Sequence, residues 1–305
     1  MRRISAMLAL AASAAAPPAA AAAASAQLPP AEREEGEQSI LVTGARPTRE
    51  ALRAFVEAVT VETDEQIAKF AVPVCPIAVG LPQGHAEVIT TRLRQVAEHV
   101  GVGTAREGCE PNVVVVIADS GSDFMRGLRR ERASLFARLE ASEIREIMEL
   151  EGPVRAWHLV EARGADGRPV DYIEVGRERR IRPSLSGVMP SLTRTPIRRD
   201  MAMSFVVFDV EAIEGFTLLQ IADHAAMRAL ARSAPVSMPA GRSILGLFAD
   251  RDAGARPAGE LAEWDVAYLS ALYRTAHDVT AQRQRSSIAG TMSRQLRTPP
   301  RQPHP

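Results

Sequence analysis

Cysteine, lysine and aromatic residues are scarce in this sequence of 305 residues, which has two cysteines, one lysine and only 4% aromatic residues. Beyond the N-terminus, no stretch approaches the ~20 consecutive apolar residues that a membrane-spanning helix needs. The formal net charge is zero, so total charge gives no indication of binding to nucleic acid or to an anionic membrane. A Gly-rich phosphate loop and a Gly-x-Ser-x-Gly elbow are also missing, which leaves the common nucleotide-binding and serine hydrolase mechanisms without an anchor.

The N-terminus has the pattern of a secretory leader. Arg2 and Arg3 precede an apolar stretch over residues 4–16, and the small residues 24–26 (Ala-Ser-Ala) suit signal peptidase. The apolar stretch is too short to span a bilayer, although an uncleaved N-terminal anchor is the alternative interpretation. We therefore predict a signal peptide over residues 1–26 and a protein that is exported, to the periplasm or to the medium.

Composition divides the remaining chain into three parts. Residues 27–48 are polar and acidic and predict a flexible lead-in. Residues 49–276 carry the periodic apolar patterns and predict a single globular domain. Residues 277–305 are rich in Arg, Pro and Gln, and predict a frayed helix followed by a disordered tail.

The two cysteines, Cys75 and Cys109, predict one disulfide bond. An even number of cysteines in an exported chain favours a bridge, and this one closes a loop of about 34 residues. A redox pair or a metal site is the alternative. Redox pairs are usually closer together in sequence, and zinc sites need more ligands than two.

Apolar periodicity predicts an α/β fold. The amphipathic segments predict helices over residues 49–59, 85–100, 217–231 and 260–276. Strands are predicted over residues 112–118, 157–161 and 204–210, and the first of these is apolar on both faces, as in a central strand. Residues 176–200 are rich in Arg, Pro and Ser and predict a long irregular excursion.

Polar residues of possible chemical interest occur in two places. Asp119 and Asp123 follow the predicted central strand, where α/β proteins often bind ligands, but such residues also suit a strand-to-helix turn. His224 lies one helical turn after Gln220 and next to Asp223, so Gln220 and His224 share one helix face. This second group could contact a ligand, or its members could simply bond neighbouring groups, because glutamine is a poor zinc ligand.

The order of elements resembles that of zinc-dependent metalloprotease domains of the metzincin type. The segment 260–273 is similar to the closing helix of such domains, which commonly reads Leu-Thr-x-x-Asp and then Leu-Tyr, and Ser243-Ile244-Leu245 lies where the family has its methionine turn. The chain is also similar to uncharacterised bacterial exported proteins with a zincin-like layout. The resemblance covers residues 70–276 and implies a zincin-like mixed sheet with flanking helices.

The zinc motif of that family is missing. The pattern His-Glu-x-x-His-x-x-Gly-x-x-His superposes best with Gln220 at the first ligand and Ile221 at the catalytic glutamate. His224 then falls on the second ligand, Met227 on the glycine and Leu230 on the third ligand. With one imidazole and no carboxylate to accept a proton from bound water, the resemblance implies no metal, no cofactor and no catalytic residue.

The predicted function is therefore that of a non-catalytic exported protein, similar to an inactive metalloprotease, with a peptide or an envelope protein as its partner. Nucleic acid is not an expected partner. The alternatives are a hydrolase of another class, using Asp119 or the Gln220/Asp223/His224 face, and a structural protein of the envelope. A cavity in which Asp119 or His224 converges with other polar groups would favour the hydrolase.

Overall fold

The computed structural model describes residues 47–136, 139–175, 180–187, 191, 193–234 and 240–297. The predicted signal peptide, nearly all of the predicted lead-in and the last eight residues lie outside these ranges. Among the described residues, no helix has the length and apolar character needed to cross a bilayer.

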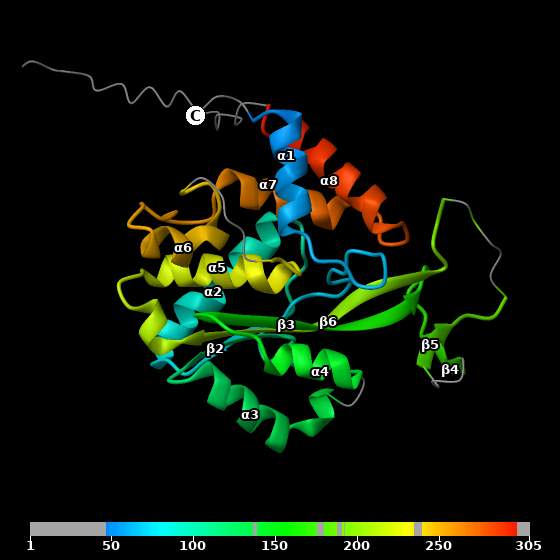
Figure 1. The fold of residues 1–305 in the computed structure, drawn as a ribbon, viewed down its shortest axis with the longest axis horizontal. Coiled ribbons are helices and arrows are strands. Elements are labelled where there is room, and N and C mark those ends of the chain that lie inside the picture. Colours follow the sequence, from blue (N-terminus) through cyan, green and yellow to red (C-terminus); the bar gives the residue numbers. More distant parts are fainter. Residues whose placement is uncertain are drawn as a thin grey trace, which may run out of the picture. The chain divides into compact units, whose positions relative to one another are not determined.

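The described residues form eight α-helices and six β-strands (Figure 1). The helices are α1 (Arg49–Val59), α2 (Gln83–His99), α3 (Gly121–Glu131), α4 (Ala141–Met148), α5 (Leu218–Leu230), α6 (Leu247–Asp252), α7 (Glu263–Arg274) and α8 (Ala281–Gln295). The strands are β1 (Pro76–Val79), β2 (Val113–Ala118), β3 (Val154–Gly164), β4 (Asp171–Val175), β5 (Arg180–Ser184) and β6 (Ile197–Asp209). Three short 3₁₀ segments complete the set, η1 (Ala133–Phe136), η2 (Val210–Ile213) and η3 (Ile244–Gly246).

Four of the strands form one mixed sheet in the order β1-β2-β6-β3. β1, β2 and β6 are parallel, and β3 runs antiparallel to β6 at the edge. β2 lies between two parallel neighbours, with Val115 paired to Ala78 on one side and to Val206 on the other. This confirms that the valine-rich run is an inner strand, as its apolar character on both faces predicts.

β3 and β6 continue beyond the parallel part of the sheet. They pair from Val154 and Phe208 to Gly164 and Ile197, with a shift of register at Leu159. β4 and β5 form a separate two-stranded sheet. The predicted irregular excursion over residues 176–200 therefore contains β5 and the first residues of β6.

Helices cover both faces of the sheet. Figure 1 shows α2 and α5 on one side and α3 and α4 on the other. On the α5 side, alternate residues of β2 such as Val115 and Ile117 join a main core that also includes α1, α7 and α8. On the α3–α4 side, Val116 joins a smaller core in which Trp157 stacks on Phe205 with ring centroids 4.6 Å apart. The predicted α/β class with flanking helices is confirmed.

The predicted disulfide is present. Cys75 and Cys109 are bonded, with an S–S distance of 2.00 Å. The bond links the start of β1 to the segment that precedes β2. Asn112 supports the same junction, because its side-chain oxygen accepts a hydrogen bond from the backbone N–H of Cys75 at 2.7 Å.

The predicted end of the globular domain at residue 276 is wrong. In place of a frayed helix, α8 runs over 15 residues and buries Ile288 and Met292 completely. Both side chains belong to the main core. The sequence of α8 is mostly polar, so its narrow apolar stripe gives a weak signal, and it is the packing against α1 and α7 that stabilises it. The predicted tail after Arg297 lies outside the described residues.

Candidate functional site

α5 carries the predicted site, and its first turn is built as a capping box. The Thr217 hydroxyl accepts from the Gln220 N–H at 3.2 Å, and the Gln220 side-chain oxygen accepts from the Thr217 N–H at 3.0 Å. The Gln220 amide nitrogen donates to the Ala258 carbonyl at 2.9 Å. Both ends of the glutamine side chain are therefore committed to fixing the start of the helix.

Asp223 is fully buried and connects three segments of the chain. Its carboxylate accepts from Arg92 Nε at 2.6 Å and from Arg92 Nη2 at 3.0 Å, a two-point contact with α2. It also accepts from the Leu261 N–H at 2.8 Å, just before α7. The bond to Asp223 raises the pKa of Arg92 above its ordinary value. Asp223 thus holds α2, α5 and the entrance to α7 together.

His224 lies among aromatic rings. It is 4% exposed, and its ring centroid is 5.7 Å from that of Phe208 and 5.2 Å from that of Phe248. Its Nδ1 is buried without a hydrogen-bond partner. Burial, with a smaller contribution from the positive charge of Arg228, lowers the pKa of His224 to about 3. The imidazole is therefore neutral at physiological pH, but aromatic rings rather than polar groups surround it.

The other positions of the superposed zinc motif are occupied by packing residues. Ile221, Met227 and Leu230 are between 0% and 2% exposed and belong to the main core. No group of three or more His, Cys, Asp or Glu that could hold a metal ion is found in the described part of the chain. At the positions of the motif, the helix presents core contacts and a cap rather than a set of ligands.

Asp119 does not join this group. It is exposed just after the end of β2, next to Ser120, whose hydroxyl caps α3. Asp209 instead occupies the carboxyl ends of β2 and β6, where its Oδ1 accepts from the Gly121 N–H at 2.5 Å and from Arg155 at 3.0 Å. The place where many α/β proteins bind an anion is thus filled by a carboxylate of the chain itself.

A cavity with a volume of about 350 Å³ lies between α2 and the entrance to α7. It is lined by Arg92, Gln95, Val96, His99, Val100, Glu260, Leu261 and Val266. The lining includes none of the predicted candidate residues Asp119, Asp123, Gln220, Asp223 and His224. Arg92 is bonded to Asp223 and lies 3.8 Å from Glu260, so its charge is already balanced. The balanced charge of Arg92 therefore gives no indication of the charge of a ligand.

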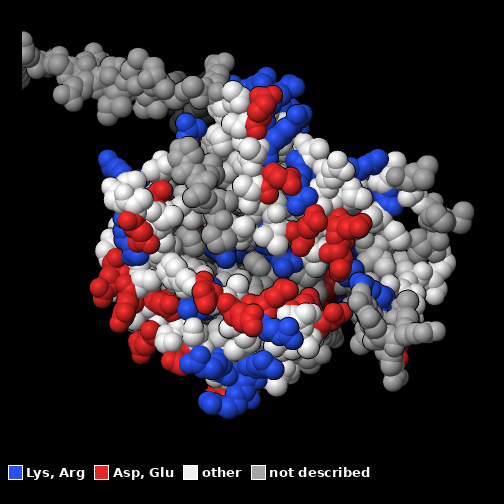
Figure 2. Space-filling view, viewed as in Figure 1, with Lys and Arg blue, Asp and Glu red and all other residues white. Residues whose placement is uncertain are grey.

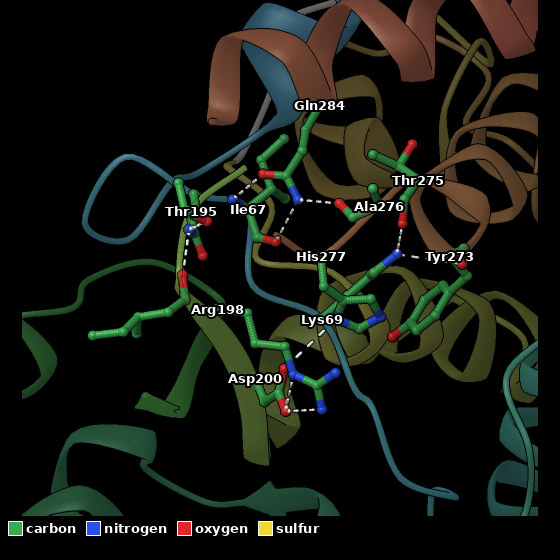
Figure 3. Close-up of polar contacts among 12 residues, drawn as sticks. Ile67, Lys69, Thr195, Arg198, Asp200, Tyr273, Thr275, Ala276, His277 and Gln284 are labelled. Carbon is green, nitrogen blue, oxygen red and sulfur yellow. Dashed lines mark hydrogen bonds and ion pairs between the residues drawn. The ribbon is translucent and has the colours of Figure 1, made fainter. Parts of the chain in front are cut away.

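A buried polar network lies elsewhere, around Lys69 (Figure 3). The Lys69 ammonium group donates to the backbone carbonyls of Leu272, Tyr273 and Thr275, at the C-terminal end of α7. Lys69 is 0% exposed, and this burial lowers its pKa to about 8 while the charge of Asp200 opposes the change. A cation at this end of a helix is stabilised by the helix dipole. Lys69 therefore acts as a structural cap of α7 and is closed to any substrate.

Two further groups of contacts belong to the same network, one around Gln284 and one around Asp200 (Figure 3). The Gln284 side chain of α8 accepts from the Ile67 N–H at 2.7 Å and donates to the carbonyls of Ile67 and Ala276. Asp200 of β6 accepts from Arg198 and lies 3.6 Å from His277 Nδ1. Sequence reasoning missed this network, and its one signal was that Lys69 is the only lysine of an arginine-rich chain.

Comparison with protein-family models, with curated proteins and with solved structures finds no match to this chain.

Proposed function

We propose that this chain is an exported, non-catalytic protein on a degenerate metzincin-like scaffold, which acts by binding a peptide or an envelope protein. One observation carries the proposal. Gln220, Ile221 and His224, which stand where the family has two zinc ligands and its catalytic glutamate, are respectively a helix cap, a core residue and a ring packed between phenylalanines. None of them is placed to bind a metal or to activate water.

The scaffold half of the proposal is supported by the junction between η3 and α7. The Asp265 carboxylate accepts from the Ser243 hydroxyl at 2.5 Å and from the Ile244 N–H at 2.7 Å. The turn and the closing helix, from which the resemblance was inferred, thus form one bonded unit beside α5. Burial raises the pKa of Asp265 to about 6, against the lowering effect of these hydrogen bonds.

Export is supported by the leader pattern and by the Cys75–Cys109 disulfide, which is typical of an oxidising compartment. The alternative of a hydrolase of another class has less support. Asp119 is exposed, while Asp223 is committed to Arg92. A catalytic acid–base pair needs two groups that face one substrate, and these do not.

The test is to measure the metal content and the peptidase activity of the purified protein. We expect zinc well below one equivalent after incubation with zinc and desalting, and no cleavage of a mixed peptide library. A zinc-dependent protease treated identically serves as the positive control. Stoichiometric zinc together with chelator-sensitive peptide cleavage would overturn the proposal.

A further inference from the structure

The charges on the α3–α4 side of the molecule are sorted into two neighbouring surfaces. The basic patch consists of the exposed residues Arg126, Arg129, Arg130 and Arg132. The acidic band consists of the exposed residues Glu143, Glu146, Glu149 and Glu151, and the exposed Arg145 lies among them, so the band is acidic in balance. Figure 2 shows basic residues gathered at the end of the molecule where Figure 1 places α3, with acidic residues running across the surface beside them.

The basic patch is only weakly neutralised within the chain. Arg126 pairs with Asp123, and Arg130 lies 3.6 Å from Glu131, but all four side chains are between 64% and 79% exposed. Exposed pairs of this kind contribute little, because water screens them. Arg129 and Arg132, for their part, make no ion pair with any described residue. Among the residues that the structure describes, no ion pair joins the basic patch to the acidic band.

The composition of this surface favours a protein partner over a lipid surface. None of the exposed large hydrophobic side chains of the described chain lies in α3, η1 or α4, so nothing here could insert between lipids. The acidic band beside the basic patch would also repel an anionic bilayer. A suitable partner has a negative surface next to a positive one, in the opposite order.

A second copy of the same chain meets this requirement. A two-fold axis that runs between the two surfaces, parallel to them, places each basic patch on the acidic band of the other copy. Such an interface is isologous, so each contact occurs twice. The chain has zero net charge, so two copies have no overall repulsion to overcome.

We propose that the α3–α4 surface binds a second copy of this chain, with the basic patch of each copy against the acidic band of the other. Because the contacts are polar and exposed, the dimer is transient, and its affinity falls as salt is added. The inference concerns a surface on the opposite side of the sheet from α5 and is independent of the proposed function.

The test is sedimentation velocity on the purified protein at low and high salt, with two pairs of charge reversals. Arg129→Glu with Arg132→Glu makes both surfaces acidic, and Glu149→Arg with Glu151→Arg makes both basic while leaving the N-terminal capping box of α4 intact. The matched control is Arg53→Glu with Arg256→Glu, two exposed arginines outside the patch. Circular dichroism confirms that each variant is folded.

We expect concentration-dependent dimerisation of the wild type at about 50 mM salt, weakened at least about tenfold at about 500 mM. Each reversal pair alone should abolish it, the control should not, and an equimolar mixture of the two reversal variants should restore a heterodimer. A monomeric wild type at low salt, or a mixture that stays monomeric, would refute the proposal. Binding of the wild type to vesicles of anionic phospholipid through Arg129 and Arg132 would also refute it, by assigning the patch to a membrane.

Discussion

The two faces of the sheet treat polar residues in opposite ways. The α5 side buries them: Lys69, Asp223, Asp265 and Gln284 are all 0% exposed within or beside the main core. The core on the α3–α4 side consists of five buried apolar residues, and the charges on that side lie mostly at the surface. The difference follows from the number of elements that meet at each face, because a buried polar group needs partners from several directions.

His224 is one of several buried polar side chains of the described residues with an atom that lacks a hydrogen-bond partner. Lys69 has three acceptors and Asp223 has three donors, whereas the Nδ1 of His224 has no partner. An unpaired buried polar atom costs free energy even in a neutral group, and an unpaired buried charge costs far more, so burial keeps His224 in its neutral form. The α5 side should therefore be sensitive both to loss of polar groups and to acid, and the α3–α4 side should be sensitive to changes of packing.

The largest effect is expected at Lys69. Lys69→Met removes the ammonium group and leaves the carbonyls of Leu272, Tyr273 and Thr275 at the end of α7 without their donor. We expect a loss of about 3–5 kcal/mol in the free energy of unfolding, the range found when one side of a buried charged contact is removed. Urea denaturation measures it.

The control for this change is Arg53→Met, at an exposed position of α1 with no ion pair among the described residues. It should stay within about 0.5 kcal/mol of the wild type. If Lys69→Met were equally mild, the network of Figure 3 would contribute nothing to stability, and the contrast between the two faces would fail.

Acid should destabilise the α5 side next. The pKa of His224 falls from 6.5 in the unfolded chain to about 3 in the folded protein, and burial, with the positive charges of Arg232 and Arg228, lowers the pKa of His158 to about 3 as well. The folded state then binds fewer protons, so stability is complete above pH 6.5 and is lost as the pH falls towards 3. Each histidine contributes about 1.4 kcal/mol per pH unit. The pKa of Asp265 is raised from 3.8 to about 6, so between these pH values folded Asp265 binds more protons than it does in the unfolded chain. Its contribution to stability therefore rises as the pH falls and offsets part of the loss.

The measurement is the free energy of unfolding from urea titrations at intervals between pH 7 and pH 4. His224→Leu should flatten the profile by the contribution of one histidine, since leucine does not titrate. His85→Leu, at an exposed position of α2, is the matched control and should leave the slope unchanged. Equal slopes for the wild type and His224→Leu would mean that residue 224 is protonated freely in the folded state.

The sequence predicted the inner strand β2, the helices α1, α2, α5 and α7, and the disulfide, because each has a strong local or compositional signal. It missed α8, which has a narrow apolar stripe and depends on contacts far away in the chain. Among the candidate site residues, the shared helix face of Gln220 and His224 could be predicted from spacing. The partners of Asp223 could not, because Arg92 and Leu261 are more than 30 residues away from it on either side.

The smallest effects are expected from two glycine-to-alanine changes in α3, on the α3–α4 side of the sheet. One tests side-chain packing and the other tests helix propensity. Gly121 lies against Asp209 and Arg155, and a Cβ added to it would come within 2.7 Å of Asp209 Oδ1. Gly127, in the same helix, has nothing within 4 Å of such an atom. We expect Gly121→Ala to lower the free energy of unfolding by about 1–3 kcal/mol, since the carboxylate must move away from the N–H that it accepts from. Gly127→Ala should raise it by up to about 1 kcal/mol, because alanine loses less backbone entropy in a helix.

Opposite signs at two glycines of one helix would show that the end of β6 is held by the Asp209 contact. A stabilising Gly121→Ala would show that the contact is dispensable, and that the α3–α4 side tolerates changes of packing as well as of charge.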